Sequence, residues 1–297
     1  MAVILFCVFA IVEFLLFLRP NIYSYKYNYV KKHANTLNVI IFGNSHMEES
    51  LIPDTIGKSI FNFAISGRRI EYDLALAQKF IPQMNHLKYV VVPFDYSSFS
   101  NSLSLNNNED MESPMDKTFS CMYYKYMNIK MGKPIWYWSE ICSSKLKFMA
   151  RFLESDSKCR ECDSLGFVKL SLNNRLPDWE HRMMITKADK PLIYDKSKMT
   201  KISNIYNEIA YLTKQKGAKL ILISTPLYKT NREIMDLSIM NKMKVFANEL
   251  NEKYKNVEYF DYTFDTDFKD EDFFDSSHLS EFGAKKMSLK LKKGLKL

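Results

Sequence analysis

The chain has 297 residues, of which 46% are hydrophobic and 26% are charged, and its formal net charge is +8. A chain of this length and composition is typical of a globular protein with a sizeable core, in one large domain or two modest ones. The basic residues are scattered, so solvated helix faces explain the charge better than a nucleic-acid surface does. We therefore expect no nucleic-acid partner, and a basic surface near an anionic envelope polymer or lipid headgroup remains open.

The amino terminus begins with an apolar run, Ala2 to Leu18, that reads AVILFCVFAIVEFLLFL and carries one charge, Glu13. This run is at the short end of what spans a bilayer, and Glu13 would cost about 2–3 kcal/mol at the bilayer centre. A signal peptide would need a basic start and a small-x-small cleavage site, and neither is present. We expect an uncleaved transmembrane helix over residues 1–20 and a juxtamembrane linker over residues 21–36.

Strand and helix patterns alternate along the rest of the chain. Short apolar runs predict five buried strands, at Asn38–Phe42, Ser59–Ala64, Tyr89–Phe94, Lys219–Thr225 and Val257–Tyr262. Apolar residues at helical spacing predict helices from Ile70, between Ile202 and Gly217, from about Arg232 to Tyr254, and from Ser280 onward. Continuous apolar strands between helices predict a three-layer α/β/α domain over residues 37–297, with a mainly parallel five-stranded sheet in flavodoxin-like order.

Residues 97–198 separate the third predicted strand from the next clear helix. A loop of this length without its own structure would be unusual, so we expect an inserted subdomain or lid. All three tryptophans, Trp136, Trp138 and Trp179, lie in this insert. They could stack on sugar rings or apolar groups, but packing within a small core of the insert explains them better.

Four of the five cysteines also lie in the insert, at Cys121, Cys142, Cys159 and Cys162. An even number suits disulfide pairing if the domain is exported. The stretch CREC has the C-x-x-C spacing of a zinc knuckle, but zinc ribbons normally carry two such knuckles. Disulfides and zinc stay open as alternatives, and we predict no metal and no cofactor for the chemistry.

Two short motifs at opposite ends of the predicted domain carry residues suited to acyl chemistry. The first predicted strand runs into Gly43-Asn44-Ser45, which is either a turn or a nucleophile at the carboxyl edge of the sheet. Near the other end, Asp275 precedes His278 by three residues. Such an Asp can bind the Nδ1–H of the imidazole and leave Nε2 to take a hydroxyl proton. Taken alone, this second motif is explained better by an acid near a helix amino terminus.

In this order and on these elements, the motifs resemble the SGNH (GDSL-type) hydrolase family. The first motif of that family falls on Gly43-Asn44-Ser45 and the last on Asp275-Ser276-Ser277-His278. The Asn and Gly that follow its second strand match Asn62 and Gly67 in FNFAISG. The resemblance covers about residues 38–296, with the aromatic insert outside it.

The resemblance implies a role for each matched residue. Ser45 is the nucleophile, His278 the general base and acid, and Asp275 the orienting carboxylate. The backbone N–H groups of Ser45 and Gly67 stabilise the oxyanion, an effect worth about 3–4 kcal/mol per donor in comparable sites. The family also has an Asn donor after its third strand, whereas this chain has Asp95, which accepts hydrogen bonds when ionised.

The departure at Asp95 is shared with membrane-anchored relatives that resemble the alginate O-acetylation and teichoic-acid D-alanylation proteins. The resemblance therefore implies a membrane-anchored serine esterase or O-acyltransferase that acts on acylated cell-envelope glycans, with a membrane acyl-donor protein as a candidate partner. Hydrolysis and transfer stay open, and no substrate-binding residue is predicted. The alternative is a non-catalytic envelope polysaccharide assembly or binding protein, which the missing Asn favours and the intact Ser–His–Asp set opposes.

Two expectations follow for the placement of the domain and of the insert. The positive-inside rule, taken literally, would keep the carboxyl side of the anchor in the cytoplasm, because basic residues follow the apolar run. That bias is weak for a long trailing domain, so with the family resemblance we expect the domain outside a single-pass membrane helix. The insert leaves the sheet at the edge where Ser45 lies, so we expect residues 97–198 to cover that site.

Overall fold

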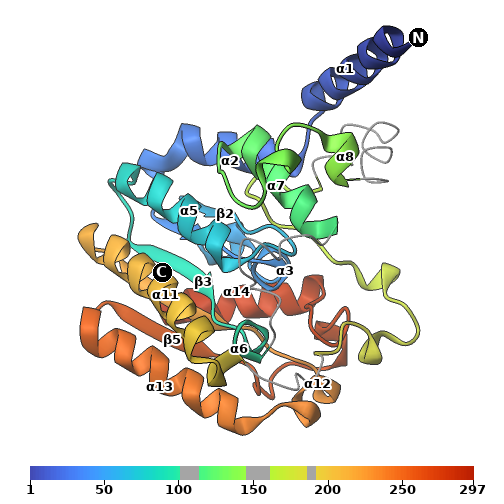
Figure 1. The fold of residues 1–297 in the computed structure, drawn as a ribbon. Helices are drawn as coiled ribbons and strands as arrows, with labels where there is room; N and C mark the ends of the chain where they lie inside the picture. Colours follow the sequence, from blue (N-terminus) through green and yellow to red (C-terminus); the bar gives the residue numbers. More distant parts are fainter. Residues whose placement is uncertain (101–113, 145–160, 186–191) are drawn as a thin grey trace. The chain divides into compact units, whose positions relative to one another are not determined.

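The computed structural model describes residues 1–100, 114–144, 161–185 and 192–297. They belong to two compact units of the chain (Figure 1). Met1–Tyr29 and Asn106–Glu161 form one, here called the helical unit, and Val30–Leu105 and Cys162–Leu297 form the other, the sheet unit. The insert expected over residues 97–198 is therefore divided between the two units. Most of its polar opening lies outside the described residues.

The sheet unit is built on five short parallel strands. These are β1 (Val39–Ile41), β2 (Ile60–Asn62), β3 (Tyr89–Pro93), β4 (Lys219–Ser224) and β5 (Val257–Asp261). Their spatial order is β2-β1-β3-β4-β5, and every pairing is parallel. This is the flavodoxin-like order, so the prediction of a mainly parallel five-stranded α/β fold is confirmed.

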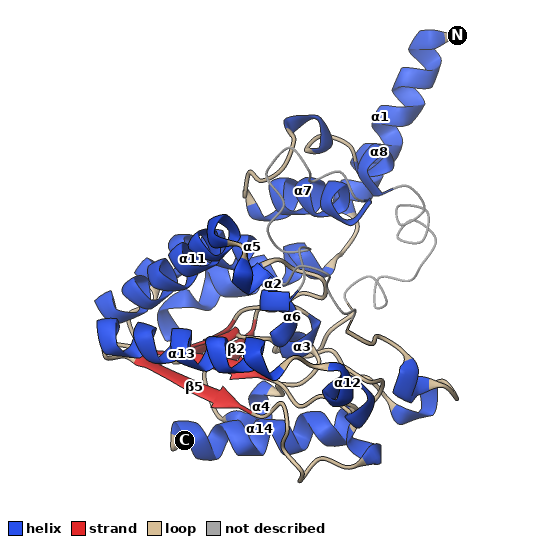
Figure 2. Cartoon of the chain, turned by 60° about the horizontal axis from the view of Figure 1, so that its bottom comes forward, coloured by secondary structure: helices blue, strands red, loops and turns tan. Residues whose placement is uncertain are grey.

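Helices cover both faces of this sheet (Figure 2). One face carries α4 (Pro53–Ile56) and α14 (Glu281–Leu295), and the other carries α5 (Ile70–Phe80), α11 (Lys196–Gln215) and α13 (Leu237–Tyr254). Alternate strand residues face opposite layers, so Ile41 and Val91 join a buried cluster with Met287 of α14. After β3, Phe94 packs against Tyr206 of α11 on the other side. Burial on both faces explains why each strand reads as a continuous apolar run.

The remaining elements are short or lie in the helical unit. The short α-helices of the sheet unit are α3 (Ser45–Glu48), α6 (Tyr96–Ser100) and α12 (Lys229–Ile234). Single 3-10 turns occur at Ala34–Thr36, Ile81–Gln83, Pro134–Trp136, Leu172–Asn174, Trp179–His181, Leu192–Tyr194 and Asp270–Asp272. The helical unit contains α1 (Ala2–Leu18), α7 (Pro114–Met127) and α8 (Glu140–Ser144), and α2 (Ile22–His33) begins in it.

One predicted helix is wrong in its extent. The pattern from Arg232 to Tyr254 predicts a single helix, whereas α12 ends at Ile234 and α13 begins at Leu237. Met235 is extended, and the side chain of Asp236 accepts a hydrogen bond from the backbone N–H of Ser238 at 2.8 Å. Asp at this position caps a new helix start more readily than it continues an old one, which the apolar spacing alone does not reveal.

The helical unit contains the apolar amino-terminal run as helix α1. The carboxylate of Glu13 accepts hydrogen bonds from Lys125 Nζ at 2.8 Å and Ser139 Oγ at 2.6 Å. It also accepts the backbone N–H groups of Glu140 and Ile141, the first residues of α8, at 3.1 and 3.0 Å. The one charge of the apolar run is therefore paired and hydrogen-bonded within the unit.

No single helix in the described part of the chain is long and apolar enough to cross a membrane. The segments Ala2–Leu18 and Ile22–Thr36 pass the length and composition test together, with a bend of 48° at the break between them. The helix predicted over residues 1–20 is found as α1, but it ends at Leu18 and does not pass the test alone. The break has a local cause, because Arg19 is extended and a residue before proline disfavours helical backbone.

The described cysteines form no disulfide. These are Cys7, Cys121, Cys142 and Cys162, whereas Cys159 lies outside the described residues. Cys121 is buried in α7 whereas Cys142 is exposed in α8. The pairing expected for an exported domain is therefore absent among these four side chains. Nor does any group of three or more His, Cys, Asp or Glu side chains within the described ranges have the arrangement of a metal site.

Candidate active site

The turn after β1 places Ser45 at the carboxyl edge of the sheet. Gly43 has a φ of 129°, in the region that favours glycine. A side chain there would also approach Met47 and Pro93 to 2.7 Å. Asn44 follows in extended conformation, and its side chain accepts the backbone N–H of His46 at 3.1 Å. The glycine is thus required for the chain to turn from the buried strand into the short helix that begins with Ser45.

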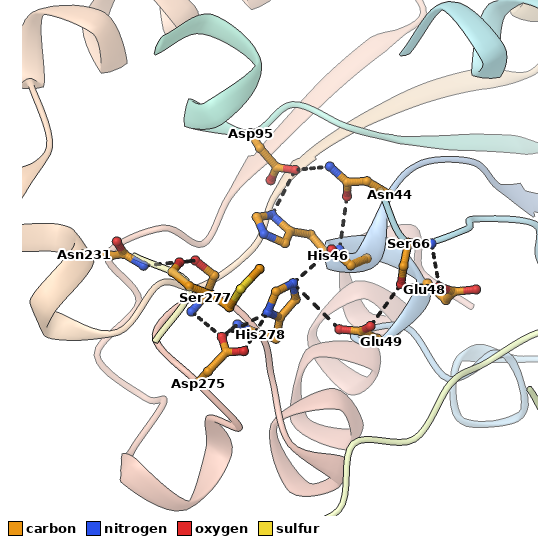
Figure 3. A network of polar contacts seen from close by, with 12 residues as sticks. Asn44, His46, Glu48, Glu49, Ser66, Asp95, Asn231, Asp275, Ser277 and His278 are labelled. Carbon is orange, nitrogen blue, oxygen red and sulfur yellow. Dashed lines mark hydrogen bonds and ion pairs between the residues drawn. The ribbon is translucent and has the colours of Figure 1, made fainter. Parts of the chain in front are cut away.

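The three residues predicted for acyl chemistry lie together. Ser45 Oγ is 2.9 Å from His278 Nε2. The other ring nitrogen of His278 lies 3.0 Å from both carboxylate oxygens of Asp275 (Figure 3). A hydroxyl, an imidazole and a carboxylate in this order can pass the hydroxyl proton to the ring while the carboxylate holds the ring in place.

The environment of Asp275 keeps its carboxylate ionised. Burial alone would raise the pKa of Asp275, but the hydrogen bond and charge of His278 and backbone N–H bonds bring it below its ordinary value. The backbone N–H groups of Ser277 and His278 each donate to Asp275 Oδ1 at 2.8 Å. An ionised Asp275 favours the tautomer with a proton on Nδ1, which leaves Nε2 as the acceptor for Ser45.

The loop that carries Asp275 and His278 is held by a residue that the sequence did not indicate. Asn231 of α12 is fully buried, and its Nδ2 donates to Ser276 O at 2.9 Å and Ser277 Oγ at 3.0 Å. Ser277 Oγ donates in turn to the carbonyl of Met183 at 2.7 Å. The backbone N–H of Ile185 completes this network by donating to Asn231 Oδ1 at 2.7 Å. A segment of the insert therefore lies along the loop that carries Asp275 and His278.

The backbone donors proposed for an oxyanion come from two adjacent turns. Gly67 has a φ of 74° in a turn closed by a hydrogen bond from Arg68 N to Ile65 O at 3.0 Å. Ile65 N donates to Gly43 O at 2.9 Å, which places this turn beside the residues that lead into Ser45. Within the described ranges, neither the Ser45 N–H nor the Gly67 N–H has an acceptor. Both donors are therefore open to a ligand.

A buried ion pair ties these two turns together. Asp73 Oδ1 accepts the backbone N–H of Gly43 and a hydrogen bond from Arg68 Nη1, both at 3.0 Å. The side chains of Arg68 and Asp73 are 0% and 1% exposed. A charge pair this deeply buried is costly to break, so it fixes the turn of Gly67 against the end of β1.

Two acidic residues that follow the nucleophile approach the site. Glu48 Oε2 accepts both the backbone N–H and the hydroxyl of Ser66, at 2.7 and 2.6 Å. Glu49 Oε2 lies 3.8 Å from His278 Nε2 (Figure 3). Burial raises the pKa of Glu49, and the nearby His278 opposes that rise. Their position in the turn after Ser45 was not recognisable from the motif.

Asp95 stands where the family resemblance leads one to expect an Asn donor. It is 4% exposed, and its Oδ2 lies 3.1 Å from His46 Nδ1 and 3.4 Å from Asn44 Nδ2 (Figure 3). Burial alone would lower the pKa of His46, but the charge and contact of Asp95 raise it above its ordinary value. The ring of His46 lies edge-on to the ring of His278, with 5.2 Å between centroids. The site therefore contains two imidazoles, each beside its own carboxylate.

Asn62, the other residue matched to the family, has a supporting position. Its Nδ2 donates to the carbonyls of Met47 and Leu51, both at 2.9 Å, and its Oδ1 accepts from Ala64 N at 3.1 Å. These bonds connect the end of β2 to the turn that follows Ser45. Asn62 thus holds the segment of the nucleophile without facing it.

The second part of the insert forms the wall of a pocket beside Asp275. This pocket is lined in part by Asp178, His181, Arg182 and Met183. Trp179 of the same segment packs against Tyr228, with ring centroids 4.5 Å apart. This tryptophan fills a gap between elements, whereas the polar side chains next to it line the pocket.

No protein-family model and no curated protein matches the sequence. Among solved structures, the chain is similar to a protein assigned as a platelet activating factor from Streptococcus pneumoniae, at 14% identity and a TM-score of 0.43, over 99% of this chain and 97% of that one. A protein assigned as an acylhydrolase from Bacteroides fragilis matches at 12% identity and a TM-score of 0.42, over 90% and 94%. The lipase Lip_vut3 from a goat rumen metagenome matches at 14% and 0.38, over 87% and 97%. At these identities and TM-scores the three structures contribute no evidence on the activity of this chain.

Proposed function

We propose that the protein is an SGNH-type serine esterase or O-acyltransferase with Ser45 as its nucleophile. One observation carries the proposal: Ser45 Oγ is 2.9 Å from His278 Nε2, and Asp275 lies 3.0 Å from Nδ1 of the same ring. The motif resemblance assigns the same three residues to these roles. Nucleophile, base and orienting acid have the mutual distances that acyl transfer through a serine requires.

The proposed reaction has two halves. In the first, His278 takes the proton of Ser45 while Oγ attacks the carbonyl carbon of an ester, and the N–H groups of Ser45 and Gly67 stabilise the oxyanion. When the carbonyl re-forms, the alcohol leaves with the proton from His278, and the acyl group stays on Oγ. In the second, His278 takes a proton from water or from a sugar hydroxyl, whose oxygen attacks the acyl-enzyme. The acyl group then leaves Ser45, which regains its proton.

Acylated cell-envelope glycans are the proposed substrates. The pocket beside Asp275 has polar side chains that suit a hydroxyl-rich ligand, Asp178, His181 and Arg182, and apolar ones, Leu176 and Phe274, that can pack against a sugar ring or an acyl group. A membrane protein that supplies the acyl group is the partner proposed for the transfer reaction, whereas hydrolysis needs none. Water competes with the sugar hydroxyl for the acyl-enzyme, so exclusion of water from this edge of the sheet would decide the outcome.

We further propose that helix α1 attaches the protein to a membrane and that the sheet unit lies outside the cytoplasm. Large apolar side chains are exposed along α1 from Val3 to Leu18, so this helix has no polar face to present to water. Glu13 would oppose insertion, but within the helical unit it is paired with Lys125. A paired carboxylate costs less to hold near a membrane than a free one.

Labelling with a fluorophosphonate reagent tests the proposed function. The wild-type protein should be labelled and Ser45→Ala should not, while His278→Ala should be labelled far more slowly because the serine loses its base. The second candidate is a non-catalytic envelope glycan-binding protein, which Asp95 favours because it replaces an expected donor by an acceptor. That candidate predicts no labelling of the wild-type protein.

A further inference from the structure

We propose that His46, held by Asp95, is a second functional imidazole of the site, which supplies a fixed positive charge for the oxyanion in place of the absent Asn donor. This inference rests on the proposed function, because it assigns the charge to the same acyl-transfer step. It concerns a residue that neither the motif resemblance nor the catalytic set of Ser45, His278 and Asp275 includes.

Specific contacts hold His46 in its position next to Ser45. His46 directly follows Ser45 in α3, and its backbone N–H is bound by the Asn44 side chain at 3.1 Å. Its Nδ1 lies 3.1 Å from Asp95 Oδ2, and the His46 and Asp95 side chains are 12% and 5% exposed. Asn44 Nδ2 approaches the same carboxylate oxygen at 3.4 Å. The nucleophile and the His46–Asp95 pair are therefore held by one short segment and the end of β3.

The opposite ring nitrogen of His46 is available to the site. An imidazolium carries a proton on each ring nitrogen, and Nδ1 faces Asp95. In the part of the chain that the structure describes, no residue binds Nε2 of His46. His46 also lines a small pocket at this edge of the sheet with Thr225 and Ile185. The Nε2–H of a protonated His46 is therefore left without a partner among the described residues and can serve a ligand.

Two neighbouring imidazoles with separate carboxylates can divide the work of the site. The groups that face His46 are Asp95 from the end of β3, Glu49 from the turn after α3, and Asp275 with His278 from the loop before α14. Burial opposes a charge on His46, and the three carboxylates together raise its pKa. The ring of His278 lies edge-on to that of His46, with 5.2 Å between centroids, and only His278 contacts the Ser45 hydroxyl. We therefore assign the charge to His46 and the base chemistry to His278.

The balance of charge in the proposed step follows from this division. The oxyanion gains one negative charge as Ser45 Oγ bonds to the carbonyl carbon, and the proton of Ser45 moves to His278. His46 neither gives nor takes a proton, and its charge stabilises the new oxyanion together with the Ser45 and Gly67 N–H groups. Removal of one such stabilising group costs about 10²–10³-fold in rate in comparable sites.

The test is the pH dependence of kcat/KM for p-nitrophenyl acetate, measured on the full chain. The proteins compared are the wild type, His46→Gln, Asp95→Asn and, as a control at an exposed position, His86→Gln. The wild-type rate should fall at high pH as His46 loses its proton. His46→Gln should lower the plateau about 10²-fold and remove the alkaline fall. Asp95→Asn should move the alkaline fall to lower pH, and His86→Gln should match the wild type.

Four other results would overturn the role of His46. The first is a His46→Gln rate within a few-fold of the wild type. The second is a slower His46→Gln protein that keeps the alkaline fall, because a merely structural role changes the rate and not the pH profile. If His46→Gln does not fold, an alkaline fall in Asp95→Asn at the wild-type pH is the contradicting result. A wild-type protein that neither turns over the ester nor reacts with fluorophosphonate rejects the proposed function and this role together. A reactive wild type with an unaltered His46→Gln rejects the role alone.

Discussion

Residues 114–144 and 161–185 come from one predicted insert, yet they support different parts of the molecule. In the first segment, Lys125 and Ser139 bind Glu13 of the amino-terminal helix. In the second, the carbonyl of Met183 binds the loop of His278, and the N–H of Ile185 binds Asn231, which holds that loop. Proximity in sequence therefore does not decide which unit a segment supports. That is decided by the polar groups with which the segment forms hydrogen bonds.

We expect a substitution in one region to leave the other region unchanged. The largest effect is expected at the loop that carries Asp275 and His278. Asp275→Asn should lower kcat for p-nitrophenyl acetate by about 10⁴-fold, because an amide at this position no longer favours the productive tautomer of His278. Steady-state kinetics measure this loss. The matched control is Asp178→Asn in the pocket wall, which should retain generic esterase activity, and equal losses in both variants would contradict the assigned role of Asp275.

A smaller loss is expected where the insert supports that loop. Asn231→Ala removes the donor that binds the carbonyl of Ser276 and the hydroxyl of Ser277, so the loop should no longer hold His278 at its distance from Ser45. Such supporting contacts change activity by about 10–100-fold in comparable sites. We expect this loss in kcat, with the secondary structure seen by circular dichroism unchanged. Full activity in a folded Asn231→Ala protein would show that Asn231 does not position the loop.

The corresponding change in the helical unit should affect stability and not chemistry. Glu13→Gln removes the charge that Lys125 pairs with, at a cost of about 2–3 kcal/mol for a charged hydrogen bond. Hydrogen exchange read by mass spectrometry should show faster exchange in residues 114–144, while fluorophosphonate labelling of Ser45 keeps its wild-type rate. Glu249→Gln on the exposed side of α13 is the control for both measurements. Slower labelling in Glu13→Gln would mean that the two regions are coupled.

The smallest expected effect is a spectroscopic difference between tryptophans of the two segments. Trp138 of the helical unit is 69% exposed, whereas Trp179 of the sheet unit packs on Tyr228. Tryptophans with one exposed face settle at membrane interfaces, so Trp138 should be quenched by vesicles of brominated lipid. A variant that keeps only Trp138 is compared with one that keeps only Trp179, which should remain unquenched. The reverse order would contradict attachment through the helical unit.

The sheet and the residues at its carboxyl edge could be inferred from sequence because their signals are local. Each strand is a continuous apolar run, and parallel strands end at one edge, so Ser45 could be placed at that edge, while the family resemblance predicted His278 beside it. The partners of these residues were not accessible in the same way. Asn231 is an isolated polar residue in a helical pattern, and the pairing of His46 with Asp95 joins positions on separate strand ends.

The predicted helix boundaries failed where a local polar effect outweighed the apolar pattern. Asp236 begins a new helix because its carboxylate caps the backbone N–H of Ser238. Arg19 ends α1 because a proline follows it. The division of the insert was equally hidden, since the carboxylate of Glu13 finds its donors more than a hundred positions along the chain.

The central claim, a covalent acyl-enzyme on Ser45, is tested most directly by mass spectrometry. The wild-type protein is mixed with p-nitrophenyl acetate, quenched in acid within the first turnovers, digested, and its peptides are mapped. We predict an acetyl group on Ser45, none on that peptide in Ser45→Ala, and slow accumulation in His278→Ala. An unmodified Ser45 in a protein that still hydrolyses the ester, or acetyl groups that persist at equal yield in Ser45→Ala, would contradict the account.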